Sequence, residues 1–434
     1  MKFVLACYGT RGDVEPFAAI GRELLRRGHD VDLAVTPDQV GIGDLVGLPA
    51  VAYGPDFRMV LESDFLRNLW KDFPRSLLMI RHLIESGRRS RELAAQTWSE
   101  MSTVLTTLAN GADVLVTGLI FEQLAANVAE YYDIPFAMVH VFPIRANGHM
   151  LPVLPSTLGR RAMAAYEWLN WRGTKELEDQ QRHRLGLSKA TGPLVRRMRD
   201  RGHLEIQAYD ECLVPGLAAE WASSASQRPF VGALTLELPT TADEEVAEWI
   251  AAGTPPIFFG FGSMPVESGA DTLAMLGAAC AELGERALIC AGWSDFSNVP
   301  HHGHVKVVDA VNYGAIFPSC RAVVHHGGTG TLAAGLRAGV PMLILWMLPD
   351  QQIWAARVKR LKVGTARRYG STTQKSLVAD LRTVLSPRCA TRAREIARRM
   401  TKSTDSVEAA ADHLERAARA KRVDGSGDIG PIAG

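Results

Sequence analysis

Hydrophobic and polar positions along the chain form two alternating kinds of segment. Short apolar runs bounded by glycine or polar residues predict buried parallel strands. They occur at residues 3–7, 31–35, 113–117 and 135–141, and again at 256–263, 287–291, 305–308, 322–325 and 341–345. Between them lie segments of helical periodicity, such as 15–27, which ends at Gly28, and 122–132. This alternation predicts an α/β protein with two doubly wound, Rossmann-like domains.

Composition along the chain divides it into five parts. Residues 145–222 are mostly polar and helical in pattern, and we expect Trp168, Trp171 and Trp221 to anchor their packing. Residues 223–239 carry Ser, Pro and Gly without periodicity, which is typical of a linker. The expected order is a first domain at 1–222, a linker at 223–239, a second domain at 240–390, C-terminal helices at 391–420 and a disordered tail at 421–434.

Charge and cysteine usage exclude some classes of protein. The 434 residues carry a net charge of +1, which gives no case for nucleic-acid binding. No run of about 18 apolar residues is present, so no membrane-spanning helix is expected. The six cysteines show no metal-site spacing and none is needed for a disulfide. We expect a cytoplasmic protein; the sequence leaves its oligomeric state open.

The most informative stretch is Ala322–Thr331, AVVHHGGTGT. A buried strand turns through glycines into a helix, so unpaired backbone N–H groups and the positive end of the helix dipole face the same space. Such a helix start is an anion site, most often for phosphate. Thr329 and Thr331 can add hydroxyl donors. The alternative is an ordinary strand-to-helix turn.

Four motifs together resemble the GT-B inverting nucleotide-sugar glycosyltransferases, in the branch of the sterol and the bacterial glycopeptide and macrolide enzymes. They are GTRGDVEP at 9–16, FGFGSM at 259–264 with AGW at 291–293, HHGGTGT at 325–331, and GVP at 339–341 continuing to Asp350-Gln351. The resemblance implies two facing Rossmann-like domains, with the acceptor in the first and the nucleotide sugar in the second. It also implies a last helix that crosses back to the first domain.

The resemblance assigns donor ligands in the second domain. The diphosphate would be held by His326, Gly328, Thr329, Gly330, Thr331 and Ser263, the nucleoside by Trp293 and Val311, and the sugar hydroxyls by Asp350 and Gln351. His325 would pack or hold the loop. The alternatives are a histidine bonded within a turn, and an Asp350-Gln351 pair that caps the next helix.

Asp13 is the candidate general base. It follows the first strand at the edge where open α/β sheets bind ligands, and inverting transfer needs a group that takes the proton of the acceptor hydroxyl. Its alternative role is to cap the following helix. No cofactor is expected. A metal is not expected either, because Asp30-Val31-Asp32 begins a strand and the Asp-x-Asp metal motif belongs to another fold.

The acceptor side is rich in aromatic residues. Gly12, Phe65, His140 and Phe142 are the candidate acceptor contacts, and the surrounding apolar side chains favour a lipid, sterol-like, polyketide or lipopeptide acceptor with a hydroxyl. Arg75, Arg81, Arg88, Arg89 and Arg91 suggest a peripheral contact with an anionic membrane, with a solvated basic face as the alternative.

Several departures from the family pattern keep the substrates open. Plant relatives carry Trp-Asn-Ser where this chain has 329–331, and Ala334 stands at their ribose-binding Glu. The sequence therefore leaves UDP and TDP donors both possible. The alternative functions are a nucleotide-sugar epimerase of the same fold, a non-catalytic nucleotide-sugar-binding protein and a dehydrogenase, although no G-x-G-x-x-G follows any strand.

Overall fold

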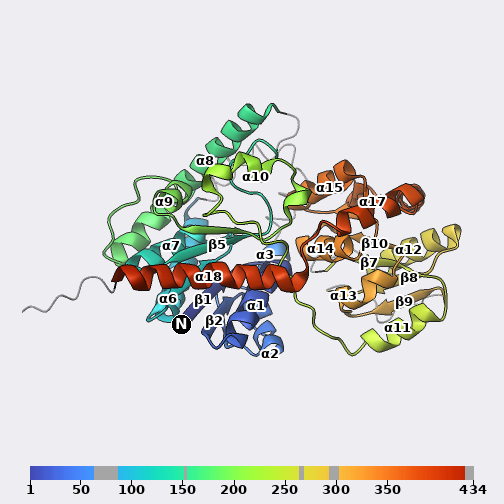
Figure 1. The fold of residues 1–434 in the computed structure, drawn as a ribbon, viewed down its shortest axis with the longest axis horizontal. Helices are drawn as coiled ribbons and strands as arrows, with labels where there is room; N and C mark the ends of the chain where they lie inside the picture. The colour runs from blue at the N-terminus through green and yellow to red at the C-terminus, as the bar shows by residue number, and fades with distance from the viewer. Residues whose placement is uncertain (63–86, 151–153, 263–267, 293–302, 426–434) are drawn as a thin grey trace, which may run out of the picture. The chain divides into compact units, whose positions relative to one another are not determined.

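The computed structural model describes residues 1–62, 87–150, 154–262, 268–292 and 303–425. The chain forms two compact units (Figure 1). The first contains Met1–Tyr209, Gly216–Leu234 and Ser403–Gly434, and the second contains Asp210–Pro215 and Thr235–Lys402. The fold is GT-B-like in the sense predicted, because each unit is built on its own parallel sheet.

The sheet of the first unit has six strands in its described part, in the order β3-β2-β1-β4-β5-β6. All neighbours run parallel. The strands are β1 (Lys2–Cys7), β2 (Asp30–Val35), β3 (Ala50–Ala52), β4 (Val114–Thr117), β5 (Phe136–His140) and β6 (Leu204–Gln207). The central β1 is apolar on both faces because helices cover both, and Phe3, Val4 and Leu5 are fully buried.

Helices connect these strands. They are α1 (Arg11–Arg26), α2 (Ile42–Val46), α3 (Phe57–Glu62), α6 (Gly87–Ala109), α7 (Glu122–Tyr131), α8 (Ser156–Arg184), α9 (Leu194–Asp200), α10 (Leu217–Glu220) and α18 (Ser403–Gly425). Helix α1 begins four residues before the predicted start at residue 15. The reason is a capping box between Thr10 and Asp13, which starts the helix inside the GTRGDVEP motif.

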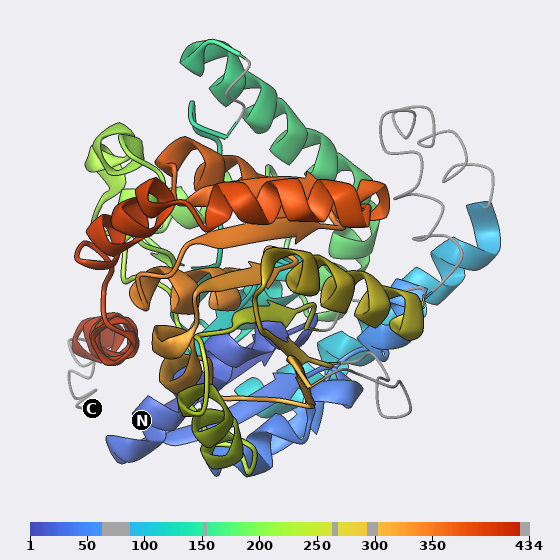
Figure 2. The ribbon, with the colours of Figure 1, turned by 90° about the vertical axis from the view of Figure 1, so that its right-hand side faces the viewer.

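The second unit is also built on one parallel sheet. Within the described residues its six parallel strands have the order β12-β11-β10-β7-β8-β9. They are β7 (Ile257–Gly260), β8 (Ala287–Cys290), β9 (Val305–Val308), β10 (Ala322–His325), β11 (Met342–Trp346) and β12 (Gly364–Arg368). Its helices are α11 (Asp243–Ala251), α12 (Gly269–Leu283), α13 (Tyr313–Ile316), α14 (Thr329–Arg337), α15 (Pro349–Leu361), α16 (Gln374–Val384) and α17 (Pro387–Ala397). Helices α12 and α16 lie side by side on one face (Figure 2).

The last helix returns to the first unit, as the sequence predicted. Helix α18 packs on α1 through an apolar seam, in which Ala410, Ala411 and Leu414 are fully buried. Polar contacts border the seam, with Arg27 Nη1 2.6 Å from Asp412 Oδ1 and His29 Nε2 3.0 Å from Glu415 Oε1. Helix α17, which was grouped with it, instead packs against α14 in the second unit.

Two further expectations concern packing. Trp171 and Trp221 are buried anchors, but Trp168 is not: half of its surface is exposed. Trp171, three residues later on the same helix, is 7% exposed. All six cysteines are buried and free.

No helix in the described part of the chain is long and apolar enough to cross a membrane.

Candidate active site

The loop after β10 has the geometry expected of an anion site. Strand β10 is buried along its whole length, and α14 begins directly after Gly328, whose extended backbone (φ −62°, ψ 141°) makes it the N-cap. Gly327 has a φ of +104°, and a Cβ there would lie 3.1 Å from both Ile344 Cγ2 and Gln351 Cβ. Only glycine fits this turn. The first N–H groups of α14 lack helical acceptors and carry the positive end of its dipole.

His326 lies between two glycine backbones beside this helix start. A Cβ on Gly328 would be 2.6 Å from His326 Nε2, and one on Gly262 would be 3.0 Å from Cε1. Its Nδ1 is buried and has no hydrogen-bond partner among the described residues. Burial lowers the pKa of His326 to about 4, against a weaker opposing effect of the Gly260 backbone. The imidazole is therefore neutral at pH 7, and it can offer an N–H donor without a full positive charge.

His325 holds the loop after β10 through a hydrogen bond to its backbone. It is fully buried, and its Nδ1 accepts a hydrogen bond of 3.2 Å from the Gly327 N–H. Burial lowers its pKa to about 3, and the neighbouring His326 adds to the effect. Because Nδ1 accepts, the proton of the neutral ring is on Nε2. This geometry corresponds to the loop-holding role expected for His325.

The start of α15 is tied to the start of α14. Trp354 Nε1 donates a hydrogen bond of 3.0 Å to Thr329 Oγ1, so the predicted phosphate ligand is positioned by a buried indole. Gln351 is almost fully buried, and its Oε1 accepts from the backbone N–H groups of Met347 (2.8 Å) and Leu348 (3.0 Å). Its carbonyl thus caps α15, the alternative that the sequence left open. Asp350 lies in the first turn of the same helix, and its side chain is outside the described part of the structure.

The remaining donor candidates follow neighbouring strands of the same sheet. Gly262 and Gly292 lie two residues after the ends of β7 and β8, both with φ near +60° (+58° and +59°), and a Cβ on Gly292 would lie 2.4 Å from the Gly262 carbonyl oxygen. Ser263 and Trp293 come next and lie outside the described residues. Val311 is buried just before α13. Gly330 and Thr331 are in the first turn of α14 and are partly exposed.

Asp13 occupies the start of α1 in the first unit. Thr10 donates twice to its Oδ2, from the backbone N–H and from Oγ1, both at 2.9 Å. Gly9 makes this possible: its φ is +153°, and a Cβ there would lie 2.4 Å from Asp13 Oδ2. The carboxylate is partly exposed and Gly12 beside it is exposed. Capping and a chemical role are therefore both compatible with this position.

The candidate acceptor contacts differ in how far they are buried. His140 ends β5, two strands from β1, with 2% of its surface exposed, and neither ring nitrogen has a hydrogen-bond partner in the described residues. Burial, helped by Arg145, lowers its pKa to about 3, so it is neutral at pH 7. Phe142 is partly buried, and Phe65 lies outside the described residues, as do Arg75, Arg81 and the side chains of Arg88, Arg89 and Arg91.

The first unit also contains a buried ionic cluster that the sequence analysis does not predict. Arg145 Nε lies 2.8 Å from Glu205 Oε1, and its Nη2 lies 3.0 Å from Glu122 Oε2. All three side chains are almost fully buried. Arg228 adds a second cation to Glu205 at 2.6 Å. The only sequence signal was an acidic residue within an apolar strand, Glu205, which is unusual enough to require a partner.

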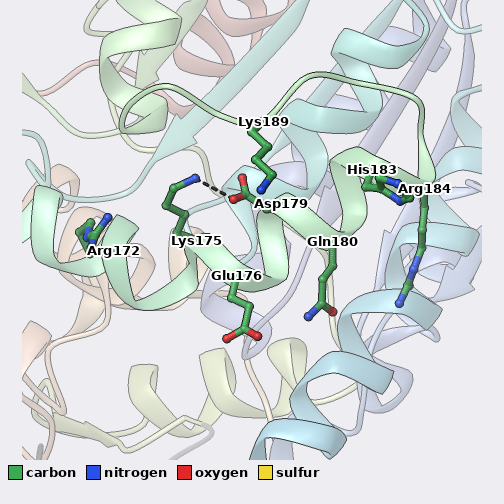
Figure 3. A pocket seen from close by; sticks show the side chains of 8 residues that line it. All are labelled: Arg172, Lys175, Glu176, Asp179, Gln180, His183, Arg184 and Lys189. Carbon is green, nitrogen blue, oxygen red and sulfur yellow. Dashed lines mark hydrogen bonds and ion pairs between the residues drawn. The ribbon is translucent and has the colours of Figure 1, made fainter.

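A groove of about 710 Å³ runs along the C-terminal half of α8 (Figure 3). It is lined by charged and polar side chains, from Arg172 to Lys189. Four basic and two acidic side chains line it; Lys175 forms an ion pair of 2.8 Å with Asp179, and Arg184 is bonded to Ser99 at 2.6 Å. The groove therefore lacks the apolar lining expected for the acceptor, and none of the predicted site residues lines it.

Comparisons with known proteins show the family of this chain. Residues 3–86 match the glycosyltransferase family 28 N-terminal domain, and residues 274–415 match the C-terminal domain of erythromycin biosynthesis protein CIII-like proteins. An uncharacterized glycosyltransferase of Mycobacterium tuberculosis is 57% identical over 425 residues, covering 97% of this chain and 100% of that protein. The chain belongs to the GT-B glycosyltransferases.

More distant relatives of this glycosyltransferase show how widely its fold is shared. Glycosyltransferase GtfE of Amycolatopsis orientalis is 28% identical over 95% of this chain and 97% of its own. The calicheamicin glycosyltransferase CalG4 has a similar structure, with a TM-score of 0.67 at 18% identity and 99% coverage of both chains. VinC, whose structure contains DTDP, gives a TM-score of 0.64 at 18% identity, with 97% of this chain and 100% of VinC covered.

Among the described residues no cluster of three His, Cys, Asp or Glu side chains is arranged to hold a metal ion. In the Asp30-Val31-Asp32 stretch, Asp32 forms an ion pair of 3.3 Å with Lys2, which is an ordinary contact between neighbouring strands.

Proposed function

We propose that this glycosyltransferase transfers a hexose or 6-deoxyhexose, with inversion and without a metal ion, from a UDP- or TDP-sugar to a hydroxyl of an apolar acceptor. The observation that carries the donor half is the start of α14. A neutral His326, the N-cap Gly328 and the positioned Thr329 surround the backbone N–H groups at the start of α14, which have no acceptor within the helix. Neutral donors and a helix dipole suit a diphosphate whose negative charge grows as it leaves.

In the proposed reaction, the acceptor oxygen attacks the anomeric carbon on the side opposite the nucleotide. The bond between that carbon and the diphosphate oxygen breaks, and the electron pair leaves with the diphosphate. Asp13 accepts the proton of the acceptor hydroxyl, and Thr10 orients the carboxylate through its two hydrogen bonds to Oδ2. The proposal requires Asp13 and the start of α14 to reach the same substrate during turnover.

We further propose that TDP-6-deoxyhexoses are better donors than UDP-glucose. Trp346 ends β11 on the same face as Ile344, which contacts the Gly327 turn, and its ring is partly exposed below the Arg368 guanidinium at 6.0 Å. An apolar ring at this edge favours a methyl group over an unpaired 6-hydroxyl, whose burial costs about 1–3 kcal/mol. The DTDP in VinC supports a thymidine nucleotide by analogy.

A thermal-shift screen against UDP-, TDP- and GDP-sugars tests the donor class, because a ligand that binds the folded state raises the unfolding temperature. The kcat/KM values of a TDP-6-deoxyhexose and of UDP-glucose, measured with the same acceptor, then test the choice of sugar. A clear preference for UDP-glucose contradicts only the deoxysugar proposal. NMR of the donor without an acceptor separates the alternatives: an epimerase converts it, and a non-catalytic binding protein never turns it over.

A further inference from the structure

The N-terminal half of α8 exposes an unusual amount of apolar surface. Its large side chains Leu158, Tyr166, Trp168 and Leu169 are 50%, 63%, 50% and 62% exposed. With the small residues Ala162 and Ala165 they recur at helical spacing, so they share one side of the helix. In both views the first turns of α8 extend beyond the neighbouring elements of the first unit (Figures 1 and 2). We call this surface the α8 patch.

Charges around the α8 patch have one sign. Arg161 and Arg172 are exposed on the patch side of the helix, and the Arg172 guanidinium lies 5.7 Å from the centre of the Trp168 ring. The one acidic residue in this half, Glu167, points to the other side and accepts a hydrogen bond of 2.8 Å from the Ala146 N–H. Exposed acidic residues begin only at Glu176, beside the charged groove. As far as Arg172 the exposed charges beside this apolar patch are therefore basic, and the exposed Glu176 follows one turn later.

This combination matches a helix that lies in the surface of a membrane. Such helices bury an apolar face containing Trp and Leu, while Arg and Lys contact anionic headgroups. Trp and Tyr are the side chains enriched at the boundary between lipid and water. We propose that the α8 patch docks this glycosyltransferase on an anionic lipid surface. The inference rests on the surface alone and is independent of the donor and the acceptor.

Vesicle binding tests the proposal without measuring activity. The full chain should cosediment with vesicles that contain phosphatidylglycerol, much less with pure phosphatidylcholine, and less as salt rises. The double variant W168S/L169S should bind at least about tenfold more weakly, since it removes two apolar side chains that the lipid would bury. The double variant R161Q/R172Q should lose roughly 25-fold on the anionic vesicles, about fivefold per arginine.

Leu45→Ser is the matched control, because Leu45 on α2 is 59% exposed and lies outside the patch; its binding should be unchanged. A second measurement does not depend on the double variants. Brominated lipids should quench wild-type tryptophan fluorescence, and Trp168→Phe should remove most of that quenching. Failure to bind anionic vesicles, equal loss in the Leu45 control, or quenching that persists without Trp168 would each overturn the proposal. A change of oligomeric state in W168S/L169S would also overturn it, by showing that protein covers the patch.

Discussion

Replacing His326 by alanine tests the proposed diphosphate site most directly. The imidazole has a buried Nδ1 without a partner in the described residues, and its ring lies against the backbones of Gly262 and Gly328. A hydrogen bond to a charged group contributes about 1.5–3 kcal/mol. Its loss should therefore weaken binding of a nucleoside diphosphate about 10- to 150-fold. Binding should persist at the weaker level, because the start of α14 retains its N–H groups.

Two controls separate a lost phosphate contact from a disturbed loop. Isothermal titration of the nucleoside without phosphates should give the same affinity for wild type and His326→Ala. His326→Asn and His326→Gln place an amide N–H near the former Nδ1 and Nε2 positions, so the variant that restores binding identifies the donating nitrogen. Equal losses for the nucleoside and its diphosphate, or no loss at all, would refute the role of His326.

The pH dependence of donor binding provides an independent check on the same residue. The pKa of His326 in the free protein is lowered to about 4 by burial. Its ring is then neutral throughout the range from pH 6 to 8. Binding of the diphosphate in that range should follow only the ionisation of the ligand. A wild-type step near pH 6.5 that disappears in His326→Gln would show instead that a protonated imidazole binds the donor.

Three other predictions follow from the structure. Asp13→Asn should keep donor affinity but slow transfer about 10²- to 10⁴-fold; normal turnover in the folded variant would exclude Asp13 as the base. Because burial lowers the pKa of His140 to about 3, the unfolded chain binds this proton first as the pH falls; the contribution of His140 to stability is complete above about pH 6.5 and is lost by about 1.4 kcal/mol per pH unit between there and about pH 3. His140→Leu should make the acid limb of urea unfolding shallower, with the contribution of partly buried His203 remaining, and an unchanged slope would contradict this. Leu414→Ala, in the seam of α18 on α1, should destabilise the first unit by about 2–5 kcal/mol, whereas the exposed Leu45→Ala should cost little; similar losses would refute the packing role of the seam.

Much of the fold was readable from sequence because its signals are local. Buried apolar runs that alternate with helical segments indicated two parallel sheets. The glycines at 327 and 328 indicated the turn into α14. The positive φ of Gly327 and the close approach of His326 to Gly328 exclude larger residues there. The capping box of Thr10 and Asp13 is equally local, and it starts α1 at Arg11, ahead of the segment of helical periodicity at 15–27.

Other features depended on residues that only the folded chain brings together. Arg145 meets Glu205 across 60 positions of sequence, and Trp354 donates to Thr329 across 25. No local pattern distinguishes Trp168, exposed, from Trp171, buried three residues later; the neighbours of α8 decide that. Gln351 is a capping residue here because two backbone N–H groups lie beside it. Sequence alone determined which residues this glycosyltransferase carries at its strand ends, and these residues carry the proposed chemistry. Tertiary structure decided which side chains are buried, paired or exposed, because burial and pairing are set by contacts between distant segments.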